Sequence, residues 1–388
     1  MIAYNTEWLD NLLLQDELEA AASENDINEE EKRTAFKAYP VGFYSPNFFI
    51  RIGLAVLTII IVAFSFGLVS LLVLSNANDK TFGAISIFFG VLCYGILELT
   101  VQQKNHYHSG VDDALLCMAG ICFIGGINLI GEISISSNCL LTFILAFYLL
   151  SRFANALMAI VSVGAFLLLV FFTYIKLGYV AKATAPFLLL LLAAGIYFFA
   201  TYLSNKIAFS LYKRTLVFVA ITALVCGYAA INYFVVNQTA NSLFGFTIPA
   251  RQPLVFAWLF WLLTILLTFV YIFRGVQKKD AIILRVGLIL IAAIVFTVRN
   301  YYTFLPIEMM LFIGGLIILI VSFGLIKYLE PPKFGFTSTA PTNPNTIGNI
   351  NIEALIITET FSGTQQPTSN DTNFGGGSFG GGGASGDF

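Results

Sequence analysis

Residues 44–75 read YSPNFFIRIGLAVLTIIIVAFSFGLVSLLVLS, and this stretch decides the class of fold. After Arg51 it carries no Asp, Glu, Lys or Arg, and it exceeds the roughly 20 apolar residues that a helix needs to cross a bilayer. Pro46 fits the first helical position, where its missing N–H costs nothing, and Ser45 before it can cap the helix. The stretch therefore predicts a transmembrane helix.

Similar apolar runs recur along the chain, and we expect ten spans at residues 50–75, 82–102, 111–131, 135–151, 154–176, 184–204, 214–236, 253–273, 280–300 and 306–329. The composition agrees, since 58% of the residues are hydrophobic and only 11% are charged, against roughly 25% charged in soluble domains. The ten-residue alternating strands of a membrane barrel are absent from the pattern. The sequence thus predicts an all-α, polytopic transmembrane helix bundle.

The fourth run, 135–151, is the weakest of the ten because it is short and begins with polar residues. If it crosses the membrane, 15 Lys and Arg residues lie on the side of the amino terminus and 5 lie on the other side. Without it, that bias largely disappears. The positive-inside rule therefore predicts ten spans with both termini in the cytoplasm.

Residues 1–48 precede the first span and are acidic, with 10 of the chain's 22 acids in the first 31 residues. They predict a helical hairpin whose second helix opens with a capping box at Asn28 and Glu31. The hairpin is too short for a core of its own, and its charge opposes an anionic leaflet. Trp8 and Leu12 are candidate contacts for a protein partner, and the alternative is that they pack on the chain's own bundle.

The chain divides into this hairpin (1–48), the bundle (49–330) and a tail (331–388) that we expect to be disordered because it is rich in polar residues and Gly. An apolar island within the tail, INIEALIITETF at 350–361, could pair as a strand, lie on the membrane or bind a partner. The polar start contains no cleavable signal peptide pattern, so we expect the first span to serve as the targeting signal. All five cysteines are interpreted as packing residues.

Residues 104–115, KNHYHSGVDDAL, contain both histidines of the chain, His106 and His108, just before two adjacent carboxylates. One hypothesis is a metal or protonation site that includes Asp112. The favoured interpretation is a polar cytoplasmic turn, in which Ser109 caps the third span and Asp112 reaches back to the cap. Both histidines are then expected to be dispensable.

Ionisable residues inside the predicted spans are few and shallow, and none lies at the midplane where a proton relay is expected. Arg299 and Glu308 flank an outer loop, and we expect an interfacial ion pair there rather than a substrate site. The pairs Gly125–Gly126 and Gly314–Gly315 predict either helix breaks of the transporter kind or close helix packing. Phosphate-loop, hydrolase, metalloprotease and nucleic-acid-binding patterns are absent, so we expect no cofactor and no nucleic-acid partner.

Several stretches together resemble a known group of proteins: the hairpin with Trp8, the INEEE start at 27–31, and YPVGFYSPN at 39–47 before the polytopic array. They are similar to a family of uncharacterised bacterial polytopic membrane proteins with an amino-terminal domain of unknown function. The tail's NFGGGSFGGGGASGDF is similar to Gly-rich ends of other bacterial envelope proteins. The resemblance implies a location in the membrane and carries no activity.

We therefore expect an integral inner-membrane protein that acts as a non-catalytic scaffold or assembly factor, with the lipid bilayer around it and a possible protein partner at the hairpin or the tail. The alternative is a transporter or flippase for a lipid-like or apolar cargo. A second alternative is a membrane enzyme that uses His106, His108 and Asp112.

Overall fold

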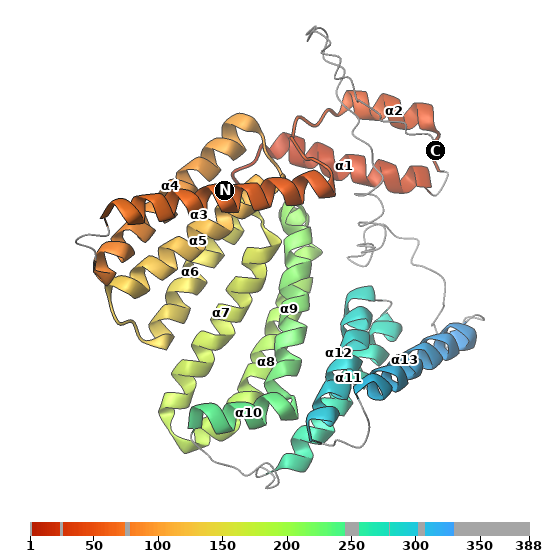
Figure 1. Cartoon of the computed structure of the whole chain (residues 1–388). Coiled ribbons are helices and arrows are strands. Elements are labelled where there is room, and N and C mark those ends of the chain that lie inside the picture. The colour runs from red at the N-terminus through yellow and green to blue at the C-terminus, as the bar shows by residue number, and fades with distance from the viewer. Residues whose placement is uncertain are drawn as a thin grey trace, which may run out of the picture.

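The computed structural model describes residues 2–23, 26–73, 78–244, 256–278, 280–301 and 307–329. This part of the chain is helical and contains no β-strand, only an isolated bridge between Tyr44 and His106. The α-helices are α1 (Thr6–Ser23), α2 (Glu29–Ala38), α3 (Phe48–Val73), α4 (Asp79–Lys104), α5 (Val111–Ile130), α6 (Ile135–Phe153), α7 (Ala156–Tyr174), α8 (Tyr179–Ser204), α9 (Lys213–Ile231), α10 (Tyr233–Phe244), α11 (Ala257–Lys278), α12 (Ala281–Tyr301) and α13 (Ile307–Leu329). Short 3₁₀ helices, η2 (Ile175–Leu177) and η3 (Ile207–Tyr212), flank α8 (Figure 1). The predicted all-α fold is confirmed; the tail 331–388, with its apolar island 350–361, lies outside the described residues.

Nine of the ten predicted spans each match one long helix, α3 to α8 and α11 to α13, and the seventh covers α9 and the start of α10. In the described residues, nine helices are long and apolar enough to cross a membrane, and α13 contributes a shorter apolar segment at Phe312–Tyr328. The chain is therefore a multi-pass membrane protein. The doubtful fourth run forms α6, which is among the nine.

The connections between helices show that α6 returns the chain to the end from which α3 started. Tyr212, just before α9, donates a hydrogen bond of 2.6 Å to the carbonyl of Ser151 in α6. Thr215 in α9 donates one of 2.6 Å to the carbonyl of Ala154, between α6 and α7. The starts of α3, α7 and α9 and the α4–α5 loop thus share one end of the bundle, which we call the amino-terminal end. This alternation requires α6 to run the full length of the bundle.

Consecutive helices pack in antiparallel pairs, of which α4 and α5 form the most extensive. Gly83 and Gly90 of α4 and Gly126 of α5 allow this approach, because a Cβ on Gly126 would lie 2.6 Å from the carbonyl oxygen of Gly83. α5 continues unbroken through Gly126, and α13 continues through Gly314, which faces Val295 of α12. Of the two hypotheses, close packing is supported for Gly126 and Gly314, whereas Gly125 and Gly315 have no atom of a neighbouring helix within 4 Å of a Cβ position.

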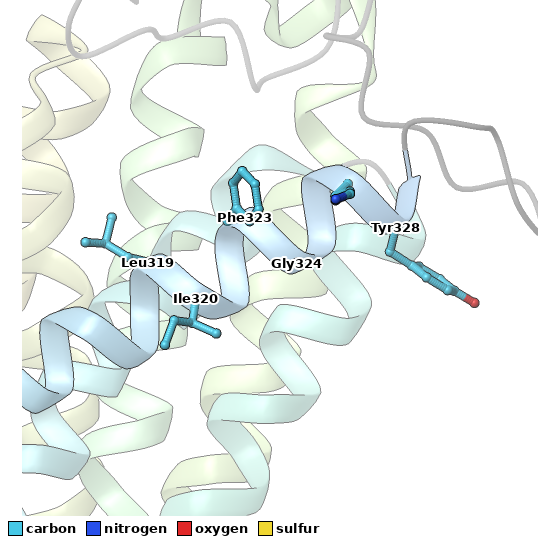
Figure 2. A pocket seen from close by; sticks show the side chains of 6 residues that line it. Leu319, Ile320, Phe323, Gly324 and Tyr328 are labelled. Atoms are coloured by element: carbon cyan, nitrogen blue, oxygen red, sulfur yellow. The ribbon is translucent and has the colours of Figure 1, made fainter.

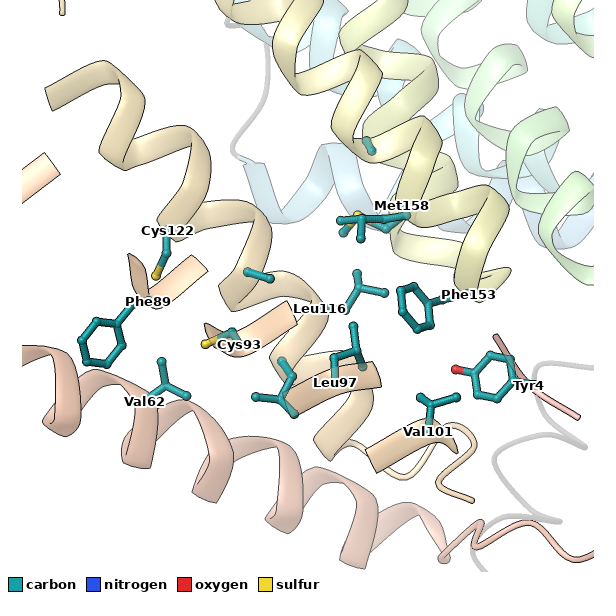
Figure 3. Packing of buried hydrophobic residues seen from close by; sticks show 14 of the residues in the cluster. Tyr4, Val62, Phe89, Cys93, Leu97, Val101, Leu116, Cys122, Phe153 and Met158 are labelled. Atoms are coloured by element: carbon teal, nitrogen blue, oxygen red, sulfur yellow. The ribbon is translucent and has the colours of Figure 1, made fainter. Parts of the chain in front are cut away.

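Buried side chains form a main core around α4, α5 and α6, joined by the first residues of the chain (Figure 3). Figure 3 shows Tyr4 at one end of this core, near Phe153, and Cys93 and Cys122 further along it, between α4 and α5. A second core lies among α8, α9, α11 and α12. The five cysteines are free, and Cys93 and Cys122 are buried packing residues of the main core, 1% and 9% exposed.

Two helix starts show where local prediction succeeded and where it failed. The capping box before α2 is confirmed, with the amide of Glu31 bound to Asn28 at 2.8 Å and the amide of Asn28 bound to Glu31 at 2.9 Å. The cap predicted for the first span at Ser45 is wrong. α3 begins later, and Asn47 accepts the hydrogen bond from the amide of Ile50 at 3.0 Å.

The seventh predicted run, 214–236, is interrupted at Asn232, where α9 ends and α10 begins. Asn232 is 3% exposed, and its amide group donates to the hydroxyls of Tyr228 and Thr297. Its side-chain oxygen accepts from the backbone amide of Phe234, in the first turn of α10. A side chain that both caps a new helix and binds two hydroxyls fixes the break at this residue.

Candidate functional site

The most polar region of the described bundle lies at its amino-terminal end, where the stretch 104–115 joins α4 to α5. α4 ends at Lys104, and Asn105 and His108 adopt left-handed backbone angles, with φ of 52° and 48°. The loop pairs with the segment before α3 through backbone groups of Tyr44. Its amide donates to the carbonyl of Asn105 at 2.9 Å, and its carbonyl accepts from the amide of Tyr107 at 3.2 Å. The predicted turn is therefore an ordered connection held by a segment some 60 residues earlier in the chain.

Asp112 closes this loop from within and is 2% exposed. Its carboxylate accepts the backbone amides of His108 and Ser109, both at 2.8 Å, and the hydroxyl of Ser109 at 3.0 Å. The prediction that Asp112 reaches back is correct. The prediction that Ser109 caps the helix is wrong, because its hydroxyl donates to Asp112 and the cap position is Gly110, at φ 89° against the backbone of Arg51.

Asp113, the next residue, binds two other helices. Its carboxylate accepts from the guanidinium of Arg51 in α3 at 2.8 Å and from the amide of Asn155, which caps α7, at 2.6 Å. His108 Nδ1 lies 3.7 Å from the same carboxylate. We call Arg51, Asp113 and Asn155 the α3–α5–α7 junction.

The two histidines have separate partners and do not meet at a common point. His106 Nδ1 lies 2.7 Å from the hydroxyl of Ser109, and its ring lies against that of Tyr44. The hydroxyl of Ser109 thus lies between a histidine and a carboxylate, whereas a catalytic triad places the histidine between the serine and the carboxylate. Ser109 is also 0% exposed, so a substrate does not reach its hydroxyl in this structure. Within the described ranges, no three His, Cys, Asp or Glu side chains come together as a metal site.

A second ion pair at the same end joins α4 to α6. Arg152 donates to both carboxylate oxygens of Glu98, each at 3.0 Å, and Tyr94 and Gln102 donate to the same carboxylate at 2.7 Å. Four donor atoms satisfy the carboxylate of Glu98, and such charge-assisted hydrogen bonds stabilise a charged group within an apolar helix. This pair could not be predicted from the sequence, because nothing in the spacing of 54 residues indicates which helices meet.

The first residues of the chain form a strap over this polar region. The amide of Ala3 donates to the carbonyl of Arg152 at 2.8 Å, which satisfies a group left free at the end of α6. Tyr4 is 7% exposed and packs edge-on against Phe43, Tyr107 and Phe153. Burial, and then the nearby Asp112, raise the pKa of Tyr4 well above its usual range, so its hydroxyl stays protonated.

The hairpin α1–α2 is attached to the bundle through this strap and through the segment before α3. The ring of Trp8 lies over Gly42, where a Cβ would overlap it, and edge-on to Phe43 at 5.3 Å. Trp8 and Leu12 are both half-buried, and Trp8 packs on Gly42 and Phe43, within residues 1–48, so their contact with a partner or with the bundle stays a prediction. The side-chain amides of Asn11 and Gln15 in α1 donate to the carbonyls of Pro40 and Tyr39, and these two hydrogen bonds hold the end of α2 against α1.

The outer part of the hairpin is acidic and uncovered. None of the residues of α2 is buried. All the acids that the structure describes within the first 31 residues are exposed: Glu7, Asp10, Asp16, Glu17, Glu19, Asp26, Glu29, Glu30 and Glu31. The hairpin thus combines a buried attachment with an exposed, negatively charged surface.

The remaining predicted site residues lie far from this end. Arg299 is in the last turn of α12 and Glu308 in the first turn of α13, with residues 302–306 between them outside the described part. Their ion pair stays a prediction. The shallow groove in Figure 2 runs along α13 and is lined by apolar residues such as Leu319, Ile320 and Phe323, as expected for a surface that faces lipid.

Comparison with known protein families, with curated proteins and with solved structures gave no match to this chain. The resemblance to an uncharacterised bacterial membrane family therefore stays a prediction. Statements about function rest on the chemistry of the chain itself.

Proposed function

We propose that this chain is a non-catalytic scaffold of a bacterial cytoplasmic membrane, with both termini in the cytoplasm, which presents the hairpin α1–α2 to a partner protein. The observation that carries the proposal is the two-sided character of the hairpin. One side is fixed to the bundle by Tyr4 and the buried Leu9, with Trp8 packed on the segment before α3, and the other side carries the exposed acids of α1 and α2. A docking element needs both a rigid mount and a free surface.

Charge supports a protein partner over the membrane surface. The described acids of the hairpin are accompanied by only three bases, Lys32, Arg33 and Lys37. Such a surface is repelled by an anionic leaflet and attracts a basic protein surface. The distribution of Lys and Arg, 15 against 5, supports the cytoplasmic orientation.

The polar residues of the amino-terminal end support a structural role at this site. Asp112, Asp113 and Glu98 each accept hydrogen bonds from several protein donors, and those donors come from α3, α4, the α4–α5 loop, the end of α6 and the residue before α7. Carboxylates satisfied in this way hold helices together and stabilise the base on which the hairpin stands.

Site-specific photo-cross-linking in native membranes tests the scaffold proposal. A cross-linker at the exposed Thr34 of α2 should give a discrete adduct with another protein, whereas one at Trp8 should react within the chain. Neutralising Glu29 and Glu30 by E29Q and E30Q should reduce the Thr34 adduct several-fold, because the attraction is electrostatic.

The matched control removes two exposed acids at the other end of the bundle, by D79N and E132Q, and should leave the Thr34 adduct unchanged. If Thr34 reacts only with this chain or with lipid, the scaffold proposal fails. An adduct that persists in E29Q/E30Q would contradict the electrostatic part of it.

A transporter is the second candidate, and the break between α9 and α10 favours it. Four polar residues at the α9–α10 break and in α11 and α12 are all at most 3% exposed: Asn232, Thr264, Thr268 and Thr297. Interrupted helices with buried polar groups are a feature of transporter sites. Translocation of labelled lipid analogues in reconstituted vesicles, lost in N232A, would favour this candidate over the scaffold.

A further inference from the structure

The first turn of α5 is shared by two structural units that have no residue in common. Asp112 faces the α4–α5 loop and the strap, with the hydroxyl of Tyr4 at 3.5 Å. Asp113 faces away to Arg51 of α3 and Asn155 of α7. The strap and the α3–α5–α7 junction are thus held by consecutive residues of one helical turn.

Further contacts leave this turn little freedom to move alone. Gly110, directly before it, lies against the backbone of Arg51 with no room for a side chain. Tyr107 packs on Tyr4 at 5.1 Å between ring centres, and the next residue, His108, donates its amide to Asp112. Tightly packed elements shift together because a partial shift would leave voids and unpaired polar groups.

A second connection runs through the end of α6. The carbonyl of Arg152 accepts the amide of Ala3, and Asn155, three residues later, binds Asp113. Phe153, between them, is 1% exposed and contacts the ring of Tyr4. The strap therefore touches the segment that carries one member of the junction.

We infer that the strap and the α3–α5–α7 junction form a coupled device: release of the strap loosens the junction, and loss of the junction releases the strap. The coupling concerns the chain alone and holds whether or not a partner binds. Combined with the proposed function, it gives a partner on the hairpin a route to the membrane helices. Coupling of this kind is reciprocal by thermodynamic necessity.

Hydrogen–deuterium exchange of the full chain in lipid nanodiscs tests the inference in both directions. The backbone amides of Arg51 and Ala159 donate to the carbonyls of Asn47 and Asn155 in the first turns of α3 and α7. In Y4A, these two amides should exchange about tenfold faster. In D113N, the amide of Ala3 should exchange faster by a similar factor. If Y4A does not accumulate, Y4L removes the aromatic contacts and keeps an apolar side chain.

The control variant is N138A, which removes the paired amides of Asn128 and Asn138 between α5 and α6 at the opposite end of the bundle. It should leave the amides of Ala3, Arg51 and Ala159 unchanged. The inference is overturned if Y4A affects only the strap and D113N affects only the junction. It is also overturned if N138A produces the same changes, because the effect would then reflect general loss of stability.

Discussion

At the scale of single residues, two adjacent carboxylates organise the polar end of the bundle. Sequence reasoning identified Asp112 as a group that reaches back over its own helix start, since that contact spans four residues and depends on local geometry. It did not identify Arg51 or Asn155 as partners of Asp113. Their separations of 62 and 42 residues carry no periodic signal, and only the packing of helices brings them together.

Removal of the Asp113 carboxylate should be costly because the buried amide of Asn155 and the partly exposed guanidinium of Arg51 both lose this acceptor. We expect D113A to lower the free energy of unfolding by about 2–4 kcal/mol, as for other broken, partly buried ion pairs. Thermal unfolding of the purified protein in detergent measures the loss. The control D79N alters an exposed acid at the other end and should change stability by less than about 0.5 kcal/mol.

The histidines should matter much less than the carboxylates. In H106A/H108A, Asp112 keeps its contacts to the backbone amide of residue 108 and to Ser109, so we expect a loss of about 1 kcal/mol and nearly normal expression. Metal analysis of the purified protein provides an independent measurement. Stoichiometric metal in the parent protein that disappears in H106A/H108A would show that the loop is a metal site.

At the scale of helices, the span predictions succeeded because bilayer thickness fixes the length of an apolar helix. α10 was missed because the break at Asn232 falls inside an apolar run, and its cause, Thr297 on α12, lies 65 residues away. Ser45 was predicted as the cap because the fixed φ of Pro46 suits a first helical residue. The structure starts the helix two residues later, where Asn47 can bind the amide of Ile50.

Neighbouring glycines of α5 provide a matched test of the α4–α5 contact. In G126A, the new methyl group would press on the carbonyl of Gly83, so we expect a loss of about 1–3 kcal/mol from overpacking. In G125A, the methyl group meets no atom within 4 Å, and stability should stay the same or rise slightly. Equal effects of the two substitutions on the unfolding temperature would show that α4 and α5 do not approach through this face.

At the scale of the whole molecule, the protein is a membrane bundle that carries an acidic hairpin, attached by the strap, at one end. Composition and charge predicted the bundle and the alternation of its helices, since both depend on the bilayer and need no knowledge of contacts. The attachment of the hairpin could not be predicted, because Tyr4 meets Phe153 and Ala3 meets Arg152 only after α4, α5 and α6 have packed. The proposed scaffold function depends on this attachment.

Threading of the chain through the membrane tests the central claim most directly, because every contact at the amino-terminal end requires the connections there to share one side. Reporter fusions at Gly178, Asn205 and Leu329 sample the start of α8, its end, and the end of α13. The account predicts that alkaline phosphatase is active only in the fusion at Gly178 and that a cytoplasmic reporter is active at Asn205 and Leu329. Active phosphatase at Asn205 or Leu329 would contradict the proposed orientation, and the same activity at Gly178 and Asn205 would contradict the fold.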